Sequence, residues 1–371
     1  MDATRPLDPS QLEVAADIRR AETLPGRLYG DEALHRVARE RVFAASWQLV
    51  ADADRIKVPG QVHPVTLLGG CLDEPLLLTR DADDRIHCLA NVCTHRGNLL
   101  CEGDGVEQVL RCRYHGRRFG LDGSFLSMPE FEGVEGFPSP ADSLPAVPMA
   151  RWKRFLFASA APALPFDALV APMEERVGFL PIEEATFDAS TSRDYLVRAS
   201  WALYCDNYLE GFHIPYVHSA LAGAVDYDLY RVELFDWSSL QIGVAEGAEE
   251  VFELPESSPD RGERILAYYF WLFPNLMFNF YPWGMSINVV EPLAADRTRV
   301  RFLNYVWDPA GPARAAYSID RVEREDEAIV EAVQQGVRSR FYDRGRYSPA
   351  REGGVHHFHR LLARTLAGEP A

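Results

Sequence analysis

The sequence predicts an α+β protein, in which an N-terminal all-β domain precedes a C-terminal domain with an antiparallel sheet covered by helices. Two observations predict this class. Short runs of β-branched and aromatic residues, separated by turn residues, recur along most of the chain, and such runs favour strands. Residues 313–340 contain few helix breakers and many helix formers, so they favour one long helix after the last strand. Strands followed by a helix of this kind favour a sheet with helices packed against it.

The elements of the first half follow from local patterns. Residues 31–47 favour a helix, because apolar residues recur among charges at helical spacing. Residues 75–79 and 85–92 favour a hairpin about the turn at residues 81–84. Prolines at positions 138, 140, 145 and 148 mark the end of the β domain. We therefore expect a helical segment over residues 1–44 that packs on the C-terminal domain, a β domain over residues 45–155, and a second domain over residues 156–371.

The second domain is expected to combine strands with helices. Residues 192–201 favour a strand, and residues 202–218 favour a helix that Pro215 disturbs. The segments that follow are rich in aromatic residues and favour strands over residues 265–273, 276–281, 286–291 and 298–307. Residues 265–285 are long and apolar enough to suggest a membrane span, but two prolines and two asparagines interrupt them, so we expect buried sheet instead.

Composition and charge argue against several classes of function. The 371 residues are 47% hydrophobic and 25% charged, which is typical of a globular protein. The formal net charge is −17, whereas binding to nucleic acid or to an anionic membrane requires a basic surface. The N-terminus lacks the pattern of a secretory signal, so we expect a cytoplasmic protein. In that compartment the six cysteines are expected to be metal ligands or buried thiols rather than disulfides.

Two short motifs in the β domain combine cysteine with histidine. Cys93 and His95 form a C-x-H pair, and Cys112 and His115 form a C-x-x-H pair. Because each pair follows a predicted strand, two thiolates and two imidazoles would meet at the tips of neighbouring loops. Two cysteines on one iron and two histidines on the other are the ligands of a Rieske [2Fe-2S] cluster. A structural zinc site built from the same four groups is the alternative, although such sites usually pair cysteine with cysteine and histidine with histidine.

A second set of metal-binding residue types lies in the C-terminal domain. His213 and His218 fall within a short segment that also contains Asn207 and Glu210. Two histidines and one carboxylate on one face of a metal form the usual site of oxygen-activating non-heme iron. An isolated pair of histidines is more often structural, so a third ligand has to be found elsewhere in the sequence.

The long C-terminal helix offers that third ligand. Its apolar stripe contains Ile319, Val322, Ile329, Val330, Val333 and Val337, and Asp326 falls in a gap of the stripe at helical spacing. A buried aspartate is costly unless it is paired or binds a metal. Glu325 lies off the stripe and Glu327 near its edge, so we expect both to be solvated. A buried salt bridge is the alternative role for Asp326.

With both motifs in this order, the chain resembles the α subunits of Rieske ring-hydroxylating and N-demethylating oxygenases. The resemblance runs from Leu24-Pro25-Gly26 and Ser46-Trp47 to the segment at residues 325–331. It implies that Cys93, His95, Cys112 and His115 bind the cluster, and that His213, His218 and Asp326 bind a mononuclear Fe(II). It also implies that Glu210 connects the iron site to His115 of a neighbouring subunit in a homotrimer. Asn207 matches a position near the family's iron.

The same resemblance implies the reaction and the partners. A separate NAD(P)H-dependent reductase, with or without a ferredoxin, would supply electrons for the activation of O2 and the oxidation of a small organic substrate. A glutamate at position 210 is similar to choline monooxygenase and to carnitine and betaine-type oxygenases, and the many aromatic residues of the second half suit a methylated amine. Hydroxylation of an aromatic ring is the alternative. Arg117 departs from the family, which usually has tryptophan at this position.

Two proteins of other classes remain as alternatives. A Rieske electron carrier would need only the first motif and a chain that ends near residue 150. A zinc-dependent structural protein would be colourless, whereas a Rieske cluster absorbs visible light.

Overall fold

The computed structural model describes residues 7–218, 221, 223–311 and 319–369. These residues form two compact units. The small unit consists of residues 44–162, and the large unit consists of the described residues before 44 and after 162. The small unit extends past residue 155, because a late strand returns to pair with the first strand of that unit.

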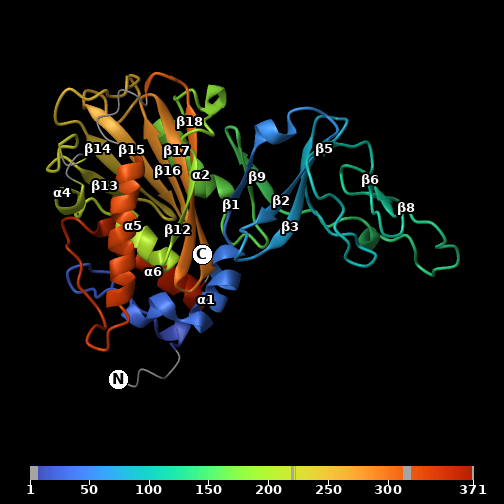
Figure 1. Ribbon diagram of the computed structural model, residues 1–371, viewed down its shortest axis with the longest axis horizontal. Helices are drawn as coiled ribbons and strands as arrows, with labels where there is room; N and C mark the ends of the chain where they lie inside the picture. The colour runs from blue at the N-terminus through green and yellow to red at the C-terminus, as the bar shows by residue number, and fades with distance from the viewer. Residues whose placement is uncertain (1–6, 219–220, 222, 312–318, 370–371) are drawn as a thin grey trace. The chain divides into compact units, whose positions relative to one another are not determined.

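The small unit is built from three antiparallel sheets (Figure 1). Its strands, in the order of each sheet, are β1 (Gln48–Asp52), β10 (Phe155–Ala158) and β9 (Met149–Trp152); β4 (Ile86–Ala90), β3 (Glu74–Arg80), β2 (Gln61–Leu67) and β5 (Gly105–Val106); and β6 (Leu110–Arg111), β7 (Arg118–Phe119) and β8 (Phe125–Ser127). The predicted hairpin is confirmed as β3 and β4. Its turn is closed by the carboxylate of Asp81, which accepts hydrogen bonds from the backbone N–H groups of Asp83 and Arg85.

One large antiparallel sheet forms the centre of the large unit. Its strands follow the order β11 (Thr186–Phe187), β18 (Arg297–Val306), β17 (Gly284–Ala294), β16 (Leu276–Tyr281), β15 (Ile265–Leu272), β14 (Ser238–Val244) and β13 (Arg231–Leu234), and β12 (Arg193–Val197) also pairs with β18. Every residue of β14 and β16 is buried. Both faces of these strands are therefore covered, and buried polar residues lie among the apolar ones: Ser238, Ser239 and Gln241 in β14 and Asn279 in β16. The four predicted strands are confirmed.

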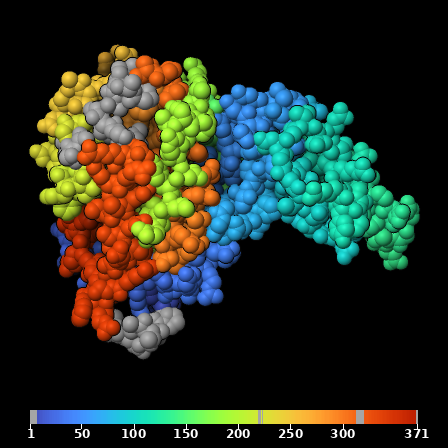
Figure 2. Space-filling model, viewed as in Figure 1, coloured from blue at the N-terminus to red at the C-terminus, as the bar shows by residue number. Residues whose placement is uncertain are grey.

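Helices and short helical turns surround this sheet (Figure 1). The α-helices are α1 (Glu32–Ala38), α2 (Phe166–Val177), α3 (Trp201–Tyr208), α4 (Ile214–Val217), α5 (Ile319–Gly336) and α6 (Gly353–Ala367). The other helical segments of the large unit are the 3-10 helices Pro9–Gln11, Gly26–Gly30 and Ile182–Glu184 and the π-helix Arg39–Phe43. The small unit contains the 3-10 helices Ala53–Ile56 and Pro140–Asp142. Helix α5 packs against α3 and β12, and in the space-filling view it forms an orange-red strip on the surface (Figure 2).

Three predicted helices differ from the observed ones. The helix expected over residues 31–47 ends as α-helix at Ala38 and continues as a π-helical turn. The helix expected over residues 202–218 is two helices, because the chain turns between Tyr208 and Ile214. Pro215 lies in the first turn of the second helix, where its missing N–H removes no helical hydrogen bond. The last long helix is shorter than predicted, with described residues from Ile319 to Gly336, and residues 313–318 of the prediction lie outside the described part.

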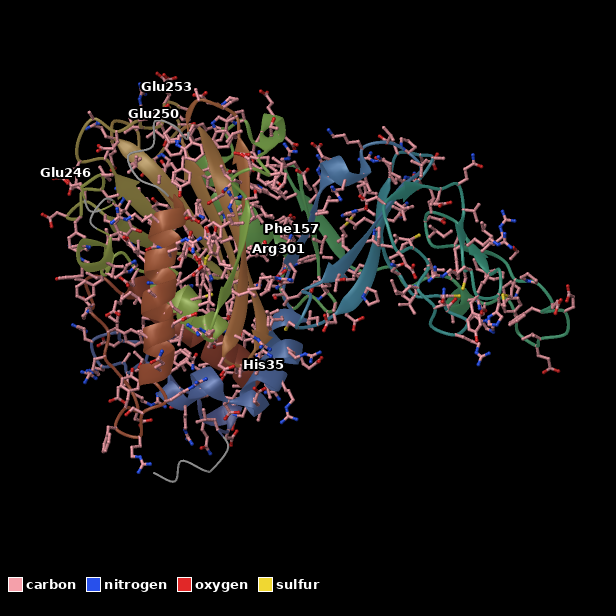
Figure 3. The ribbon with its side chains drawn as sticks, in the orientation of Figure 1. His35, Phe157, Glu246, Glu250, Glu253 and Arg301 are labelled. Atoms are coloured by element: carbon pink, nitrogen blue, oxygen red, sulfur yellow. The ribbon has the colours of Figure 1, made fainter. Side chains whose placement is uncertain are left out.

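Part of the acidic charge lies in the loop between β14 and β15. Glu246, Glu250 and Glu253 are exposed there and point away from the sheet (Figure 3). Within the described ranges, no helix combines the length and the apolar character needed to cross a membrane.

Candidate metal centres

The two cysteine–histidine motifs occupy loops with the same backbone pattern. The N–H of Gly97 donates to the carbonyl of Cys93 at 3.0 Å, and the N–H of Gly116 donates to the carbonyl of Cys112 at 2.9 Å. Both glycines have positive φ angles, 72° and 76°, which residues with a side chain rarely adopt. Each loop therefore bends back on itself directly after its histidine.

The four side chains of these loops meet as two pairs. Cys93 and Cys112 are both 2% exposed and share one hydrophobic cluster, and their thiols lie within hydrogen-bonding reach. The rings of His95 and His115 lie edge to face, with centroids 4.8 Å apart. The structure thus separates a buried sulfur pair from a less buried nitrogen pair, which is the division of ligands that a Rieske cluster requires.

The electrostatics of the pair also fit a bound cluster. Burial raises the pKa of the Cys93 thiol, despite a hydrogen bond from the backbone of His95 that lowers it. A thiolate at this position is therefore costly unless a metal cation lies beside it. Of the other cysteines, Cys71, Cys88 and Cys205 are buried, and Cys101 packs against the hydrophobic cluster that contains Cys93.

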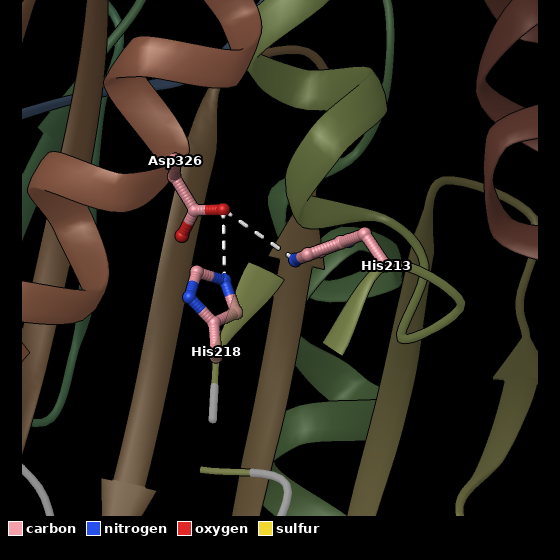
Figure 4. A group of neighbouring side chains, drawn as sticks. All are labelled: His213, His218 and Asp326. Carbon is pink, nitrogen blue, oxygen red and sulfur yellow. Dashed lines mark hydrogen bonds and ion pairs between the residues drawn. The ribbon is translucent and has the colours of Figure 1, made fainter. Parts of the chain in front are cut away.

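The second set of predicted ligands also converges (Figure 4). Oδ1 of Asp326 lies 3.0 Å from Nε2 of His218 and 3.4 Å from Nε2 of His213. One ligand atom from each residue lies within 4.8 Å of the other two. His213 and His218 flank helix α4, and Asp326 comes from α5. Two imidazole nitrogens and one carboxylate oxygen in this arrangement fit a non-heme iron.

The Nδ1 atom of each histidine is hydrogen-bonded to a glutamate carboxylate. Nδ1 of His213 lies 2.7 Å from Oε1 of Glu210, and Nδ1 of His218 lies 2.9 Å from Oε2 of Glu325. Since a carboxylate only accepts hydrogen bonds, each Nδ1 carries a proton, and in the neutral form of each ring the lone pair of Nε2 is available to a metal. Burial opposes the charged form of His218, but hydrogen bonds to Asp326 and Glu325 outweigh it and raise its pKa.

The expectation that Glu325 and Glu327 are solvated holds only in part, because both residues are partly buried. Glu325 binds His218, and this contact lowers the pKa of Glu325, as does its contact with Arg321. Oε1 of Glu327 is buried, and burial raises the pKa of that carboxyl. The contact of Glu325 with His218 cannot be inferred from the helical period, because His218 lies outside the helix.

The apolar stripe predicted for α5 is also partly wrong. Ile329 and Val333 are exposed, whereas Glu323 and Gln334 are buried beside Val330 and Val337. The two polar side chains are buried because distant groups pair with them. Oε1 of Gln334 accepts a hydrogen bond from the N–H of Ser200 at 2.8 Å, and the hydroxyl of Tyr204 donates to Glu323. Burial and the nearby Asp326 raise the pKa of Glu323 well above its ordinary value.

Sequence reasoning missed a buried network next to these residues. Asp206 accepts a hydrogen bond from the hydroxyl of Tyr29 at 2.9 Å and lies 2.8 Å from Nε2 of His359. The hydroxyl of Tyr347 lies 2.6 Å from Nδ1 of the same histidine. The network connects α3 and α6 with the N-terminal segment. No short motif signals it, because its four members are far apart in the sequence.

A cavity of about 120 Å³ opens beside the three candidate ligands. The aromatic residues that line it are Tyr204, Tyr208, Tyr230, Tyr269, Tyr281 and Phe302. Asn207 and Glu210, the other two predicted site residues, line the cavity as well. Its described lining residues include the acids Glu210, Glu323 and Asp326 and include neither lysine nor arginine.

Comparison with known families identifies both parts of the chain. The family described as ring hydroxylating alpha subunit (catalytic domain) matches residues 182–368, and the Rieske [2Fe-2S] domain family matches residues 46–138.

Individual proteins match over nearly the whole chain. The chloroplastic choline monooxygenase of Arabidopsis thaliana is 31% identical over 369 residues, covering 94% of this chain and 84% of that protein. The carnitine monooxygenase oxygenase subunit of Escherichia coli K12 is 29% identical, covering 95% of this chain and 96% of that protein. A solved structure of a quaternary ammonium Rieske monooxygenase, concerned with carnitine oxidation by gut microbiota and inter-subunit electron transfer, has a TM-score of 0.76 at 24% identity. It covers 97% of this chain and 99% of that chain, and this likeness concerns the fold.

Proposed function

Since the chain belongs to the family of ring-hydroxylating α subunits and carries a Rieske domain before its catalytic domain, we propose that it oxidises a methylated amine at an N-methyl group or an adjacent carbon. The protein is the oxygenase component of a Rieske non-heme iron enzyme, with a [2Fe-2S] cluster and a mononuclear iron as its cofactors. A separate NAD(P)H-dependent reductase supplies its electrons. The observation that carries the proposal is the convergence of His213, His218 and Asp326 beside a cavity lined by tyrosines.

We assign the ligands from the two groups of side chains described above. Cys93 and Cys112 would hold one iron of the cluster and His95 and His115 the other, while His213, His218 and Asp326 would hold the mononuclear iron. When bound, the cluster stores an electron and the mononuclear iron activates dioxygen. Glu210 and Glu325 fix the tautomers of their histidines, so both Nε2 atoms face the same point.

Exposed aromatic side chains beside each centre support a homotrimer. Tyr114 is 54% exposed and stacks on His115, with ring centroids 3.7 Å apart. Beside Glu210, Tyr216 is 81% exposed and contacts Phe212 edge to face. Large exposed aromatic residues next to functional groups favour a protein interface. We propose that His115 of one subunit approaches Glu210 of the next, and that Glu210 connects the two centres across this interface.

The charge of the cavity supports a cationic substrate. Its described lining residues include three acids and five tyrosines, and tyrosine rings attract a quaternary ammonium group through their negative faces. The hydroxyls of two of these rings are engaged by the surrounding structure. The hydroxyl of Tyr208 donates to Oδ1 of Asn279 at 2.8 Å, and that of Tyr230 donates to Oε1 of Gln241 at 3.1 Å. Such contacts fix how the rings are oriented.

The same charges favour a cation over a zwitterion. A carboxylate on the substrate would find no lysine or arginine among the described lining residues, and it would meet the carboxylates of Glu210 and Asp326 instead. Burial of an unpaired charge near like charges is unfavourable. We therefore propose that a choline-type amine is preferred over carnitine and betaines.

Oxygen uptake by the reconstituted enzyme tests this proposal. With reductase and NAD(P)H present, we expect choline to stimulate oxygen uptake more strongly than carnitine or glycine betaine. The matched control is 3,3-dimethylbutan-1-ol, which has the shape of choline without its charge and should stimulate little uptake. If no cationic amine produces either uptake or an aldehyde product, the amine proposal is wrong, and apolar aromatic substrates become the next candidates to assay.

A further inference from the structure

Arg117 is a buried cation at the position where the family usually has tryptophan. It is 2% exposed and follows the second cluster loop directly. Its Cζ atom lies 5.0 Å from the ring centroid of Phe125, 5.6 Å from that of Phe137 and 5.7 Å from that of Phe119. Burial of a guanidinium is unfavourable unless neighbouring groups compensate its charge. The groups that contact Arg117 therefore indicate its role.

Asp142 is the ionic partner of Arg117, and it contacts both cluster loops. Nη2 of Arg117 lies 2.6 Å from Oδ1 of Asp142 and donates to its backbone carbonyl at 3.0 Å. The hydroxyl of Thr94, which stands between Cys93 and His95, donates to the same carbonyl at 2.8 Å. Hydrogen bonds from Ser139, together with Arg117, lower the pKa of Asp142, so the pair is ionised at neutral pH.

Arg117 is also hydrogen-bonded directly to a candidate cluster ligand. Its backbone carbonyl accepts a hydrogen bond from the N–H of Cys112 at 2.8 Å. Its Nε is buried without a hydrogen-bond partner in the described part of the chain.

We propose that Arg117 and Asp142 form a charge pair that sets the reduction potential of the Rieske cluster. The inference rests on the ligand set proposed above. Reduction adds one electron to the cluster and thus one negative charge. The guanidinium of Arg117 therefore stabilises the reduced cluster, and the carboxylate of Asp142 opposes it. This chain would thus carry a charged residue, whose effect on the potential is opposed by Asp142, at the position where the family usually has tryptophan.

Redox titration of three variants of the full-length protein tests the proposal. The midpoint potential is measured by dithionite titration with mediators, followed by electron paramagnetic resonance of the reduced cluster. We expect Arg117→Met to lower the potential, Asp142→Asn to raise it, and the double variant to lie near the wild type. A unit charge roughly 10 Å from the cluster, at an effective dielectric constant near 20, changes the equilibrium constant for reduction of the cluster by about tenfold. For a one-electron reduction, a tenfold change corresponds to a shift of about 59 mV in the midpoint potential.

Arg113→Met is the matched control. Arg113 follows Cys112 directly but is 68% exposed, so solvent should screen its charge and its loss should leave the potential nearly unchanged. Single variants that keep the wild-type potential, or that both shift it in the same direction, would show that Arg117 only packs. If Arg117→Met loses the cluster, Asp142→Asn decides alone, and a potential that does not rise overturns the proposal. A wild-type protein without a Rieske signal would instead refute the ligand set.

Discussion

Replacement of Glu325 by alanine should weaken iron binding without affecting the Rieske cluster. The structure places Oε2 of Glu325 2.9 Å from Nδ1 of His218, whose ring is almost fully buried. Without this acceptor, His218 can carry its proton on Nε2, which is the nitrogen that faces Asp326. Loss of such a hydrogen-bond partner typically costs 10–100-fold in metal affinity, or about 1.4–2.8 kcal/mol.

Anaerobic titration of the apoprotein with Fe(II), in competition with a chromogenic chelator, measures this affinity. Glu325→Gln keeps an oxygen acceptor and should lose less affinity than Glu325→Ala. Arg321→Ala is the matched control, since Arg321 contacts Glu325 from the exposed side and lies away from the histidines. If Glu325→Ala bound iron as tightly as the wild type while Arg321→Ala did not, the role assigned to Glu325 would be wrong.

Three further predictions concern residues of the large unit. Asp326→Ala should keep the visible absorption of the cluster but lose mononuclear iron and turnover, and full activity in this variant would show that another acid is the ligand. Glu210→Gln should retain both metals but slow the oxidation of the cluster in a single-turnover experiment, and a wild-type rate would exclude Glu210 from the connection between the centres. Gln334→Ala should reduce the free energy of unfolding by about 1–3 kcal/mol, because it leaves the buried N–H of Ser200 without its partner; an unchanged denaturant midpoint would contradict that reasoning.

The fold class and the ligand candidates were predictable because their signals are local. The spacing of Cys93 with His95 and of Cys112 with His115 indicated a cluster site, and the Rieske domain match over residues 46–138 confirms that cofactor. Strands β12 and β15–β18 of the large sheet were predictable because runs of apolar, aromatic and β-branched residues favour strands, whereas β11, β13 and β14 were not predicted. Asp326 was found as a candidate from the helical spacing of the predicted apolar stripe, and the structure brings it against both histidines.

The features that escaped prediction depend on distant partners. From the sequence, Glu325 is expected to form an exposed ion pair with Arg321, which lies four residues earlier in the helix. Its contact with His218 arises from the tertiary fold, because the two residues are distant in the sequence. The burial of Glu323 and Gln334 depends on Tyr204 and on the N–H of Ser200, more than a hundred residues away. The small unit ends beyond the predicted boundary because β10 pairs with β1 across about a hundred residues, and no local pattern encodes that pairing.

Metal and sulfide analysis of anaerobically purified protein tests the central claim, that two different iron centres occupy this chain. We predict about three irons and two acid-labile sulfides per chain, with the visible absorption of a Rieske cluster. In Asp326→Ala, iron should fall by about one per chain while sulfide and colour stay unchanged. Colourless protein without sulfide, or zinc in place of iron, would contradict the account.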